Sequence, residues 1–300
     1  MRPLVSVAVF SYNQEKYIAK TIESILNQER NFAIEILIND DASTDSTPEI
    51  ISEYWKKYPD TIRLFLRPTN QGLLRCYYDV LSQCQGKYIM IIAGDDYWLA
   101  NKMRYQVNAM EADSQIGMCY GKAKVLKGNT FITDSGSKKG ERFEALLSRN
   151  YIPPLTVCVR RSVLNKYISE VEPHNKDWLM EDLPMDLWFS KNSKILYIDE
   201  FFGVYRVLEG SISRPTSLEK RLDFANSVNE ICVFFAGDDN KLKRIAQKAH
   251  ERTVASMYLA FDDMDHFRKH NSKGGIKGII KNIISFFPSG KAWLKTNITH

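Results

Sequence analysis

Two pairs of adjacent aspartates are the residues of this chain best suited to chemistry. Asn39-Asp40-Asp41 comes directly after the largely apolar run 34–38, and Gly94-Asp95-Asp96 comes directly after the run 88–93. Such runs predict buried strands, and open α/β sheets bind ligands beyond the carboxyl ends of their strands. Neighbouring carboxylates repel each other unless a cation or polar ligand groups compensate them. The repeated arrangement therefore favours a cation-dependent nucleotide site.

Alternating strands and helices must position these pairs. Strands are predicted at 4–10, 34–38, 62–66 and 88–93, and they are followed by segments of helical spacing at 18–26, 48–58, 72–84 and 101–111. Because these strands are apolar nearly throughout, we expect an α/β fold with a mostly parallel, Rossmann-like sheet flanked by helices on both faces.

The alternation becomes irregular in the second half of the chain. Further strands are predicted at 116–126, 157–160, 195–198 and 201–207, with an exposed loop or hairpin at 127–140 and a helix at 182–190. Apolar residues at three-and-four spacing predict two helices between 217 and 269, interrupted near 237–239. We expect a catalytic domain at 1–215, a helical extension at 216–270 and a basic amphipathic tail at 271–300.

The composition narrows the class of protein. The chain has 300 residues and a net charge of +5, and its lysines gather toward the carboxyl terminus, which argues against a nucleic-acid polymer as partner. Its five cysteines have no C-x-x-C spacing, so they predict neither a zinc site nor a disulfide framework. With no targeting signal and no stretch long enough to cross a bilayer, we expect a cytoplasmic protein.

Two common phosphate-binding loops are absent from the sequence. There is no G-x-G-x-x-G after the first strand, and no G-x-x-x-x-G-K-[ST] anywhere. A site that supplies carboxylates instead would hold a diphosphate through a divalent metal, which accepts oxygen ligands from both sides.

A series of short segments carries a family resemblance. These segments are 5–13, 22–28, 40–47, Asn70-Gln71-Gly72, 86–89, 94–98, Tyr205-Arg206 and 210–213. Their order and spacing resemble the family 2 glycosyltransferases of GT-A fold, of the bacterial envelope polysaccharide type, over residues 3 to about 213. The resemblance implies transfer of a sugar from a nucleotide-diphosphate donor, expected to be UDP-linked, to an acceptor hydroxyl. It also implies inversion at the anomeric carbon with help from Mn²⁺ or Mg²⁺.

The resemblance assigns donor-binding roles residue by residue. It implies that Asp41 contacts the base while Asp40 shapes the turn, and that Asp96 binds the metal while Asp95 contacts ribose or the metal shell. Further expected donor contacts are Phe10, Tyr12, Arg75 and Arg206, the two arginines as phosphate contacts. Aspartates in turns also serve as helix caps, so a structural role for either pair stays open.

The acceptor hydroxyl must lose a proton to a base, which the family supplies from an acidic element between the aspartate pair and the Tyr-Arg segment. The counterpart here is 178–188, in which Asp182 matches best and Glu181 and Asp186 are alternatives. Asp182 could instead only cap the helix that it begins.

Some positions depart from the family pattern. The residue before Gly94 is Ala93 where relatives often have an acid, and Leu208 replaces a histidine that often follows Tyr-Arg. We therefore expect Asp96, donor oxygens and water alone to hold the metal. Cys76, Tyr77 and Tyr78 replace the usual residues beside Arg75.

The carboxyl-terminal tail has two interpretations. Its isoleucines and phenylalanines within 276–287 share one helical face, flanked by lysines. This face either packs on the protein or lies in a membrane interface, where 273–287 would hold the chain at the inner face of the cell membrane. A glycan or lipid-linked acceptor for cell-surface polysaccharide would suit the second interpretation.

Two other functions stay open. A sugar nucleotidyltransferase would use a similar sheet and metal, but it normally needs a glycine-rich, basic loop where this chain has Ser11-Tyr12-Asn13-Gln14. A non-catalytic module that binds a glycan or a nucleotide is the third possibility.

Overall fold

The computed structural model describes residues 2–137, 142–208 and 215–272, together with residues 281, 285 and 294. The chain forms two compact units. The first comprises 1–143, 151–176 and 185–207, and the second comprises 144–150, 177–184 and 208–300.

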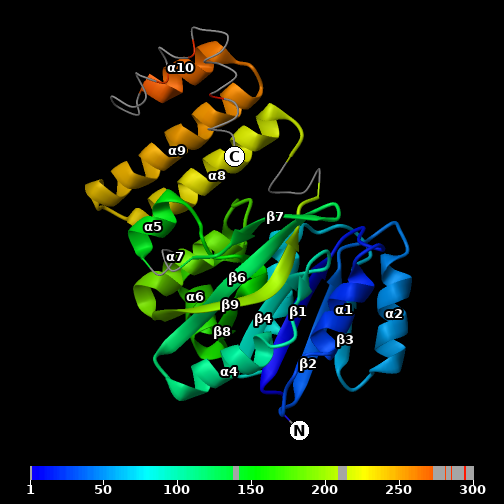
Figure 1. Cartoon of the computed structure of the whole chain (residues 1–300). Coiled ribbons are helices and arrows are strands. Elements are labelled where there is room, and N and C mark those ends of the chain that lie inside the picture. The colour runs from blue at the N-terminus through cyan, green and yellow to red at the C-terminus, as the bar shows by residue number, and fades with distance from the viewer. Residues whose placement is uncertain are drawn as a thin grey trace. The chain divides into compact units, whose positions relative to one another are not determined.

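The first unit is built on one sheet with the strand order β3-β2-β1-β4-β8-β6-β9-β5, and β7 pairs with β6 (Figure 1). Strands β1 (Val5–Ser11), β2 (Ile34–Asp40), β3 (Ile62–Leu66) and β4 (Tyr88–Ala93) are parallel, as predicted. In their register Ser11 lies opposite Asp40, and Phe10 lies opposite Ala93. The two aspartate pairs therefore follow strands that end at the same edge of the sheet.

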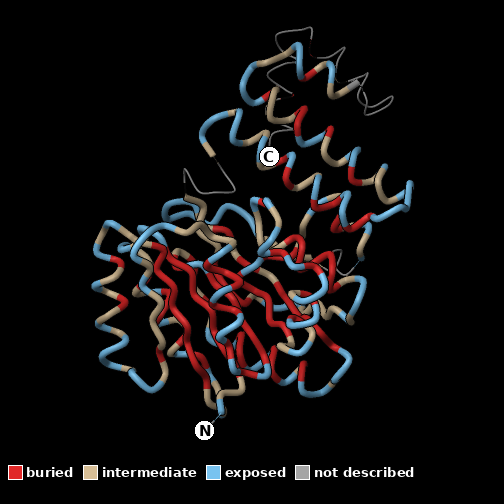
Figure 2. The backbone as a smooth tube through the Cα atoms, turned by 180° about the vertical axis from the view of Figure 1, so that it is seen from behind, coloured by how far each residue is buried: buried red, intermediate tan, exposed pale blue. Residues whose placement is uncertain are grey.

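Helices connect these strands in the predicted order. They are α1 (Ile18–Leu26), α2 (Thr47–Lys57), α3 (Leu73–Ser82) and α4 (Lys102–Ala112). In α1 the residues Ile18, Ile22 and Ile25 are fully buried, because their three-and-four spacing places them on one face. The central strands are buried along their length, whereas α2 keeps one face in solvent (Figure 2).

The second half of the sheet is mixed. Its strands are β5 (Tyr97–Trp98), β6 (Ile116–Lys127), β7 (Thr130–Ser135), β8 (Cys158–Arg160) and β9 (Lys194–Arg206). Strand β8 is antiparallel to both β4 and β6, and β6 and β7 form the predicted hairpin. The prediction of two strands at 195–198 and 201–207 was wrong. They are one strand, β9. Its pairing with β6 shifts register at the polar residues 199–200, so the strand continues past them.

Short helical elements complete the connections. They are α5 (Phe143–Ser148), the 3₁₀ turns η2 (Pro154–Thr156) and η3 (Pro173–Asn175), α6 (Arg161–Val171) and α7 (Asp182–Asn192). Helix α7 begins at the predicted residue.

The second unit contains α8 (Leu218–Ala236), α9 (Asn240–Ala260) and α10 (Met264–Ser272). The sequence predicted two helices there. The first break falls as expected at Gly237, and Asp239 caps α9 by accepting the backbone N–H groups of Lys241 and Leu242. A second break, at Asp262 in the left-handed region (φ 64°), separates α10. No helix within the described ranges is long and apolar enough to cross a membrane. Apart from residues 281 and 285, the segment 273–287 lies outside the described residues.

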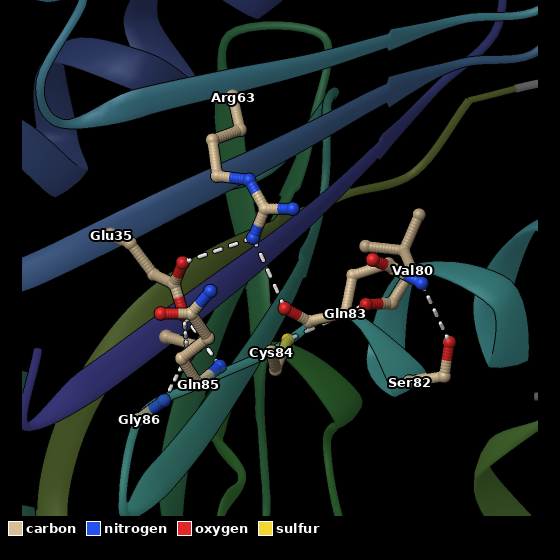
Figure 3. Close-up of polar contacts among 9 residues, drawn as sticks. Glu35, Arg63, Val80, Ser82, Gln83, Cys84, Gln85 and Gly86 are labelled. Atoms are coloured by element: carbon tan, nitrogen blue, oxygen red, sulfur yellow. Dashed lines mark hydrogen bonds and ion pairs between the residues drawn. The ribbon is translucent and has the colours of Figure 1, made fainter.

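A buried carboxylate at the opposite end of the strands has a purely structural role. Glu35 Oε1 accepts hydrogen bonds from Ser6 Oγ and from the backbone N–H of Gln85, both at 2.6 Å. Its Oε2 pairs with Arg63 at 3.3 Å (Figure 3). A Cβ on Gly86 would lie 2.5 Å from the backbone nitrogen of Ser6, so glycine is required where β4 begins. Both oxygens of Glu35 are satisfied within the protein.

A lysine is fully buried in the core of the first unit. Lys102 Nζ donates to Gln106 Oε1 at 2.5 Å and to the Val157 carbonyl at 3.1 Å, and it lies 4.4 Å from the centroid of the Trp98 ring. These partners are neutral. Burial lowers the pKa of Lys102 to about 8, and the thiols of Cys158 and Cys119 partly offset this.

This lysine predicts a pH dependence of stability. Between pH about 8 and 10.5, the unfolded chain binds a proton that the folded chain has released, so the free energy of unfolding rises with pH in that window. Complete release would contribute about 3 kcal/mol. Thermal unfolding followed from pH 7 to 10 should show wild type gaining stability relative to Lys102→Met. Parallel curves for the two proteins would contradict the buried charge.

Candidate active site

Two loops at the carboxyl edge of the sheet are tied together by hydrogen bonds. The Asn13 side chain accepts the backbone N–H of Thr44, and the backbone N–H of Asn13 donates to Ser43 Oγ, both at 2.8 Å. Asn13 and Ala42 adopt the left-handed region, with φ of 53° and 61°. Such conformations cost energy outside glycine, so these contacts hold the loop after β1 against the loop after β2.

The carboxylate of Asp40 forms hydrogen bonds within these two loops. Its carboxylate accepts Ser11 Oγ at 3.1 Å, the backbone N–H of Ser43 at 2.9 Å and Ser43 Oγ at 2.5 Å. The side chain is only 2% exposed. These contacts give Asp40 the turn-shaping role that the resemblance implied, whereas a contact with the donor stays a prediction.

Asp41 joins the end of β2 to the start of α3. Its two oxygens accept the backbone N–H groups of Gln71 and Gly72 at 2.8 and 2.9 Å, and Cys76 Sγ donates to it at 3.3 Å. A carboxylate at a helix amino terminus is favoured by the exposed N–H groups and the helix dipole. Asp41 therefore fixes the loop that leads into α3, and its contact with a nucleobase stays a prediction. Arg75, in the first turn of α3, is exposed.

The second aspartate pair is held in a tight turn after β4. Asp96 is 3% exposed, and its Oδ1 accepts the backbone N–H of Arg206 at 2.8 Å. Thr21 Oγ1 lies 2.7 Å from the carbonyl of Gly94 and 2.6 Å from that of Asp96. A Cβ on Gly94 would lie 2.3 Å from the end of the Gln14 side chain and 2.9 Å from that of Ile18, so a larger residue here would displace both side chains.

The electrostatics of this pair favour a cation. Burial raises the pKa of Asp96 well above its usual value, and the neighbouring charge of Asp95 raises it further. Burial also raises the pKa of Asp95, although Arg206 acts in the opposite direction. The backbone N–H and the charge of Arg206 offset only part of the cost of burying Asp96 beside Asp95, so the pair gains from a bound positive ion.

The donor set suits a divalent metal that shares its ligands with a bound molecule. Within the described part of the chain, no group of three or more His, Cys, Asp or Glu side chains could hold a metal ion. Mg²⁺ and Mn²⁺ accept one or two carboxylates together with phosphate oxygens and water. Asp96, with Asp95 beside it, fits such a cation only when a diphosphate completes the shell.

Arg206 holds this turn from the end of β9. Its guanidinium donates to the backbone carbonyl of Asp95 and lies 5.0 Å from the ring centroid of Tyr17 and 4.8 Å from that of Tyr97. Sequence reasoning proposed Arg206 as a phosphate contact and missed its aromatic neighbours. It also missed Thr21, although a threonine on the otherwise apolar buried face of α1 was a usable signal. The phosphate contact stays a prediction.

The aromatic residues after β1 have different surroundings. Phe10 is buried and stacks on Tyr77 with ring centroids 5.1 Å apart, and its carbonyl accepts the backbone N–H of Gly94. Tyr12 is 49% exposed, so its ring is available at this edge for stacking on a ligand. Phe10 thus supports the turn with Asp95-Asp96, and direct donor contacts by both residues stay predictions.

The candidate base lies at the amino terminus of α7. Asp182 Oδ1 accepts the backbone N–H of Leu183 at 2.8 Å, and its Oδ2 accepts the Asn150 amide at 3.4 Å. Burial raises the pKa of Asp182, and burial together with the Asp182 charge raises that of Glu181 to about 8. Raised carboxylate pKa values favour proton transfer near neutral pH. Asp186, one turn later, is 1% exposed. The choice of Asp182 stays a prediction.

The fold is shared with solved glycosyltransferases. The mannosyltransferase PcManGT from Pyrobaculum calidifontis, solved with GDP-Man and Mn²⁺, superposes with a TM-score of 0.58 and 15% identity, covering 99% of this chain and 84% of that one. The predicted GT-A fold, with its carboxyl-terminal helices, is therefore confirmed.

Sequence comparison identifies the family. Residues 6–170 match the model of glycosyl transferase family 2, and the chain belongs to this family. An uncharacterized protein of Mycobacterium tuberculosis is 33% identical over 218 residues, covering 67% of this chain; the match spans 58% of that relative's length. The Escherichia coli protein WfaP, named a UDP-Glc:α-D-GlcNAc-diphosphoundecaprenol β-1,3-glucosyltransferase, is 28% identical over 264 residues, covering 87% of this chain and 94% of WfaP.

The contacts of Arg206 predict that its side chain stabilises the folded protein. An arginine whose only role was to bind phosphate would have no such effect. Without any nucleotide, Arg206→Met should lower the free energy of unfolding by about 1–3 kcal/mol, because the Asp95 carbonyl loses its donor and two rings lose their cation. Thermal unfolding measures this. Arg75→Met, an exposed control, should stay within about 0.5 kcal/mol of wild type. An unchanged melting temperature for Arg206→Met would show that the guanidinium does not support the turn.

Proposed function

We propose that this chain is a metal-dependent glycosyltransferase that moves a sugar from a UDP-linked donor to an acceptor hydroxyl with inversion. The observation that carries the proposal is the acidic pair of the half-buried Asp95 and the buried Asp96 at the same sheet edge as Asp41. Membership of glycosyl transferase family 2 supports it, and so does the UDP-Glc in the name of WfaP.

The two pairs would hold opposite ends of the donor. The nucleobase of the donor would lie at the end of β2 beside Asp41. Tyr12 is exposed on the same edge and could stack on it. The diphosphate would lie beyond β4, where Asp96 and Asp95 would hold a divalent cation. When bound, Mn²⁺ or Mg²⁺ neutralises the charge that develops on the leaving diphosphate. Thr21 and the Arg206 backbone keep the acidic turn in place without reorganisation.

The acceptor side would supply the base. Asp182 would take the proton from the acceptor hydroxyl. The hydroxyl oxygen would attack the anomeric carbon from the face opposite the leaving diphosphate. A single displacement of this kind inverts the configuration and needs no covalent intermediate. Burial raises the pKa of Asp182, which makes its carboxylate a stronger proton acceptor.

The acceptor is proposed to be a glycan linked to a polyprenyl diphosphate in cell-surface polysaccharide synthesis. The name of WfaP, which aligns with most of this chain, supports this acceptor class. Such an acceptor resides in a membrane, so we also propose that 273–287 brings the enzyme to the inner face of the cell membrane.

Removing the metal carboxylate tests the donor site. UDP with Mn²⁺ should raise the melting temperature of wild type, and Asp96→Asn should reduce this shift and lower turnover by about 10²–10³-fold, because the leaving charge is no longer balanced. Turnover is measured as UDP release from UDP-sugars with acceptor present. The exposed control Asp60→Asn should behave as wild type. If UDP with metal shifts no melting temperature and Asp96→Asn keeps full turnover, the proposal is wrong.

Replacing the candidate base separates chemistry from binding. Asp182→Asn keeps the size of the side chain but cannot accept the proton, so transfer should fall by at least about 10²-fold while UDP affinity stays within about twofold. Single-turnover transfer and calorimetric UDP titration measure the two quantities. Asp177→Asn, an exposed neighbour, is the matched control. If Asp182→Asn were fully active, the catalytic base would be Glu181 or Asp186 instead.

A further inference from the structure

Three side chains that closely follow the acidic pair hold three consecutive backbone carbonyls. Trp98 Nε1 donates to Leu155 O at 2.8 Å, Gln106 Nε2 donates to Thr156 O at 2.7 Å, and Lys102 Nζ donates to Val157 O at 3.1 Å. The three donors are at most 3% exposed. We call this set, Trp98, Lys102 and Gln106, the carbonyl clamp.

The clamped segment borders the acidic turn. It leads into β8, which is antiparallel to β4 with Met90 opposite Cys158. The 3₁₀ turn η2, which holds Leu155 and Thr156, contacts β4. A Cβ on Gly203 would lie 2.5 Å from the Leu155 side chain and 3.0 Å from the Tyr97 carbonyl. The Leu155 side chain therefore packs at Gly203 of β9, which pairs with Trp98 of β5, the strand that follows Asp95-Asp96.

Lys102 also sets the orientation of Gln106. Because Lys102 Nζ donates to the amide oxygen of Gln106, the amide nitrogen must face Thr156 O and also Cys119 O, at 3.2 Å. Loss of the ammonium group would free the amide to rotate. Two of the three clamp contacts thus depend on one side chain.

The fold alone gives little reason for a lysine at this position. An ammonium group surrounded by neutral partners loses hydration, and apolar side chains of similar volume usually stabilise a core as well or better. Methionine would fill the same space without the cost of burying a charge. The lysine is instead suited to holding backbone carbonyls in one place.

We propose that Lys102 is a positioning residue for sugar transfer. Through the carbonyl clamp it keeps residues 155–157 at a fixed distance from the Asp95-Asp96 turn, and so shapes the part of the site that receives the sugar-diphosphate end of the donor. This inference rests on the proposed function.

Lys102→Met separates positioning from stability. At pH 7 its melting temperature should equal or exceed that of wild type, while kcat for sugar transfer should fall at least about tenfold because the clamped wall moves. Inhibition by UDP, which lacks the sugar, should change by less than about threefold. The exposed control Lys56→Met should match wild type in all three measurements.

Trp98→Phe provides a second variant that keeps the ring and the charge of Lys102 but removes the hydrogen bond to Leu155 O. It should show a smaller loss of kcat with the same unchanged UDP inhibition. Combining it with Lys102→Met should cost less than the product of the single effects, because both act through one segment.

Wild-type kcat in both variants, or a loss of kcat that only follows a loss of folded protein, would overturn the positioning role and leave the proposed function intact. Absence of sugar transfer by the wild-type enzyme with every UDP-sugar and acceptor would overturn the proposed function and this inference with it.

Discussion

The carboxyl edge of the sheet depends on the hydrogen bond between the backbone N–H of Arg206 and the buried carboxylate of Asp96. This contact joins the end of β9 to the turn after β4, across residues that are far apart in the chain. The guanidinium of Arg206 reinforces it by donating to the Asp95 carbonyl, and Thr21 binds the same turn from α1. The acidic pair is therefore held in place before any ligand arrives, which is the condition for efficient electrostatic catalysis.

The two ends of the strands show how burial separates structural from functional carboxylates. Glu35 is buried with both oxygens bound to the protein, by Ser6, the Gln85 backbone and Arg63. Asp96 is buried more deeply, yet its carboxylate accepts the backbone N–H of Arg206 and has an acidic neighbour, and the Arg206 charge offsets this only in part. Carboxylate type and burial alone would not distinguish these two residues. Their partners distinguish them, because an under-compensated charge is stabilised by binding a cation.

Much of the fold followed from local patterns. Parallel strands β1, β2 and β4 are apolar nearly throughout and buried almost along their whole length, so their sequences identified them. Strand β3 is only partly buried, but its apolar pattern also identified it, and two of the four strands have the predicted bounds. Strand β9 was predicted as two strands because Asp199 and Glu200 interrupt its apolar pattern. It is one strand because it pairs with β6 on both sides of these two residues. Helix α10 was missed because its separation from α9 depends on one left-handed residue, Asp262, which carries no strong sequence signal.

The sequence by itself determined the class of site: which strands end in aspartates, that no glycine-rich phosphate loop is present, and which family the pattern resembles. Local periodicity and turn chemistry set these features, so they can be read along the chain. Only the tertiary structure decided what each polar group does. Asp41 binds the backbone N–H of Gln71, 30 residues later, in the loop that leads into α3. Arg206 supports the acidic turn, and Lys102 holds the carbonyl of Val157, 55 residues away. Such roles arise from contacts between distant segments, whose distances and burial are set by packing of the whole sheet.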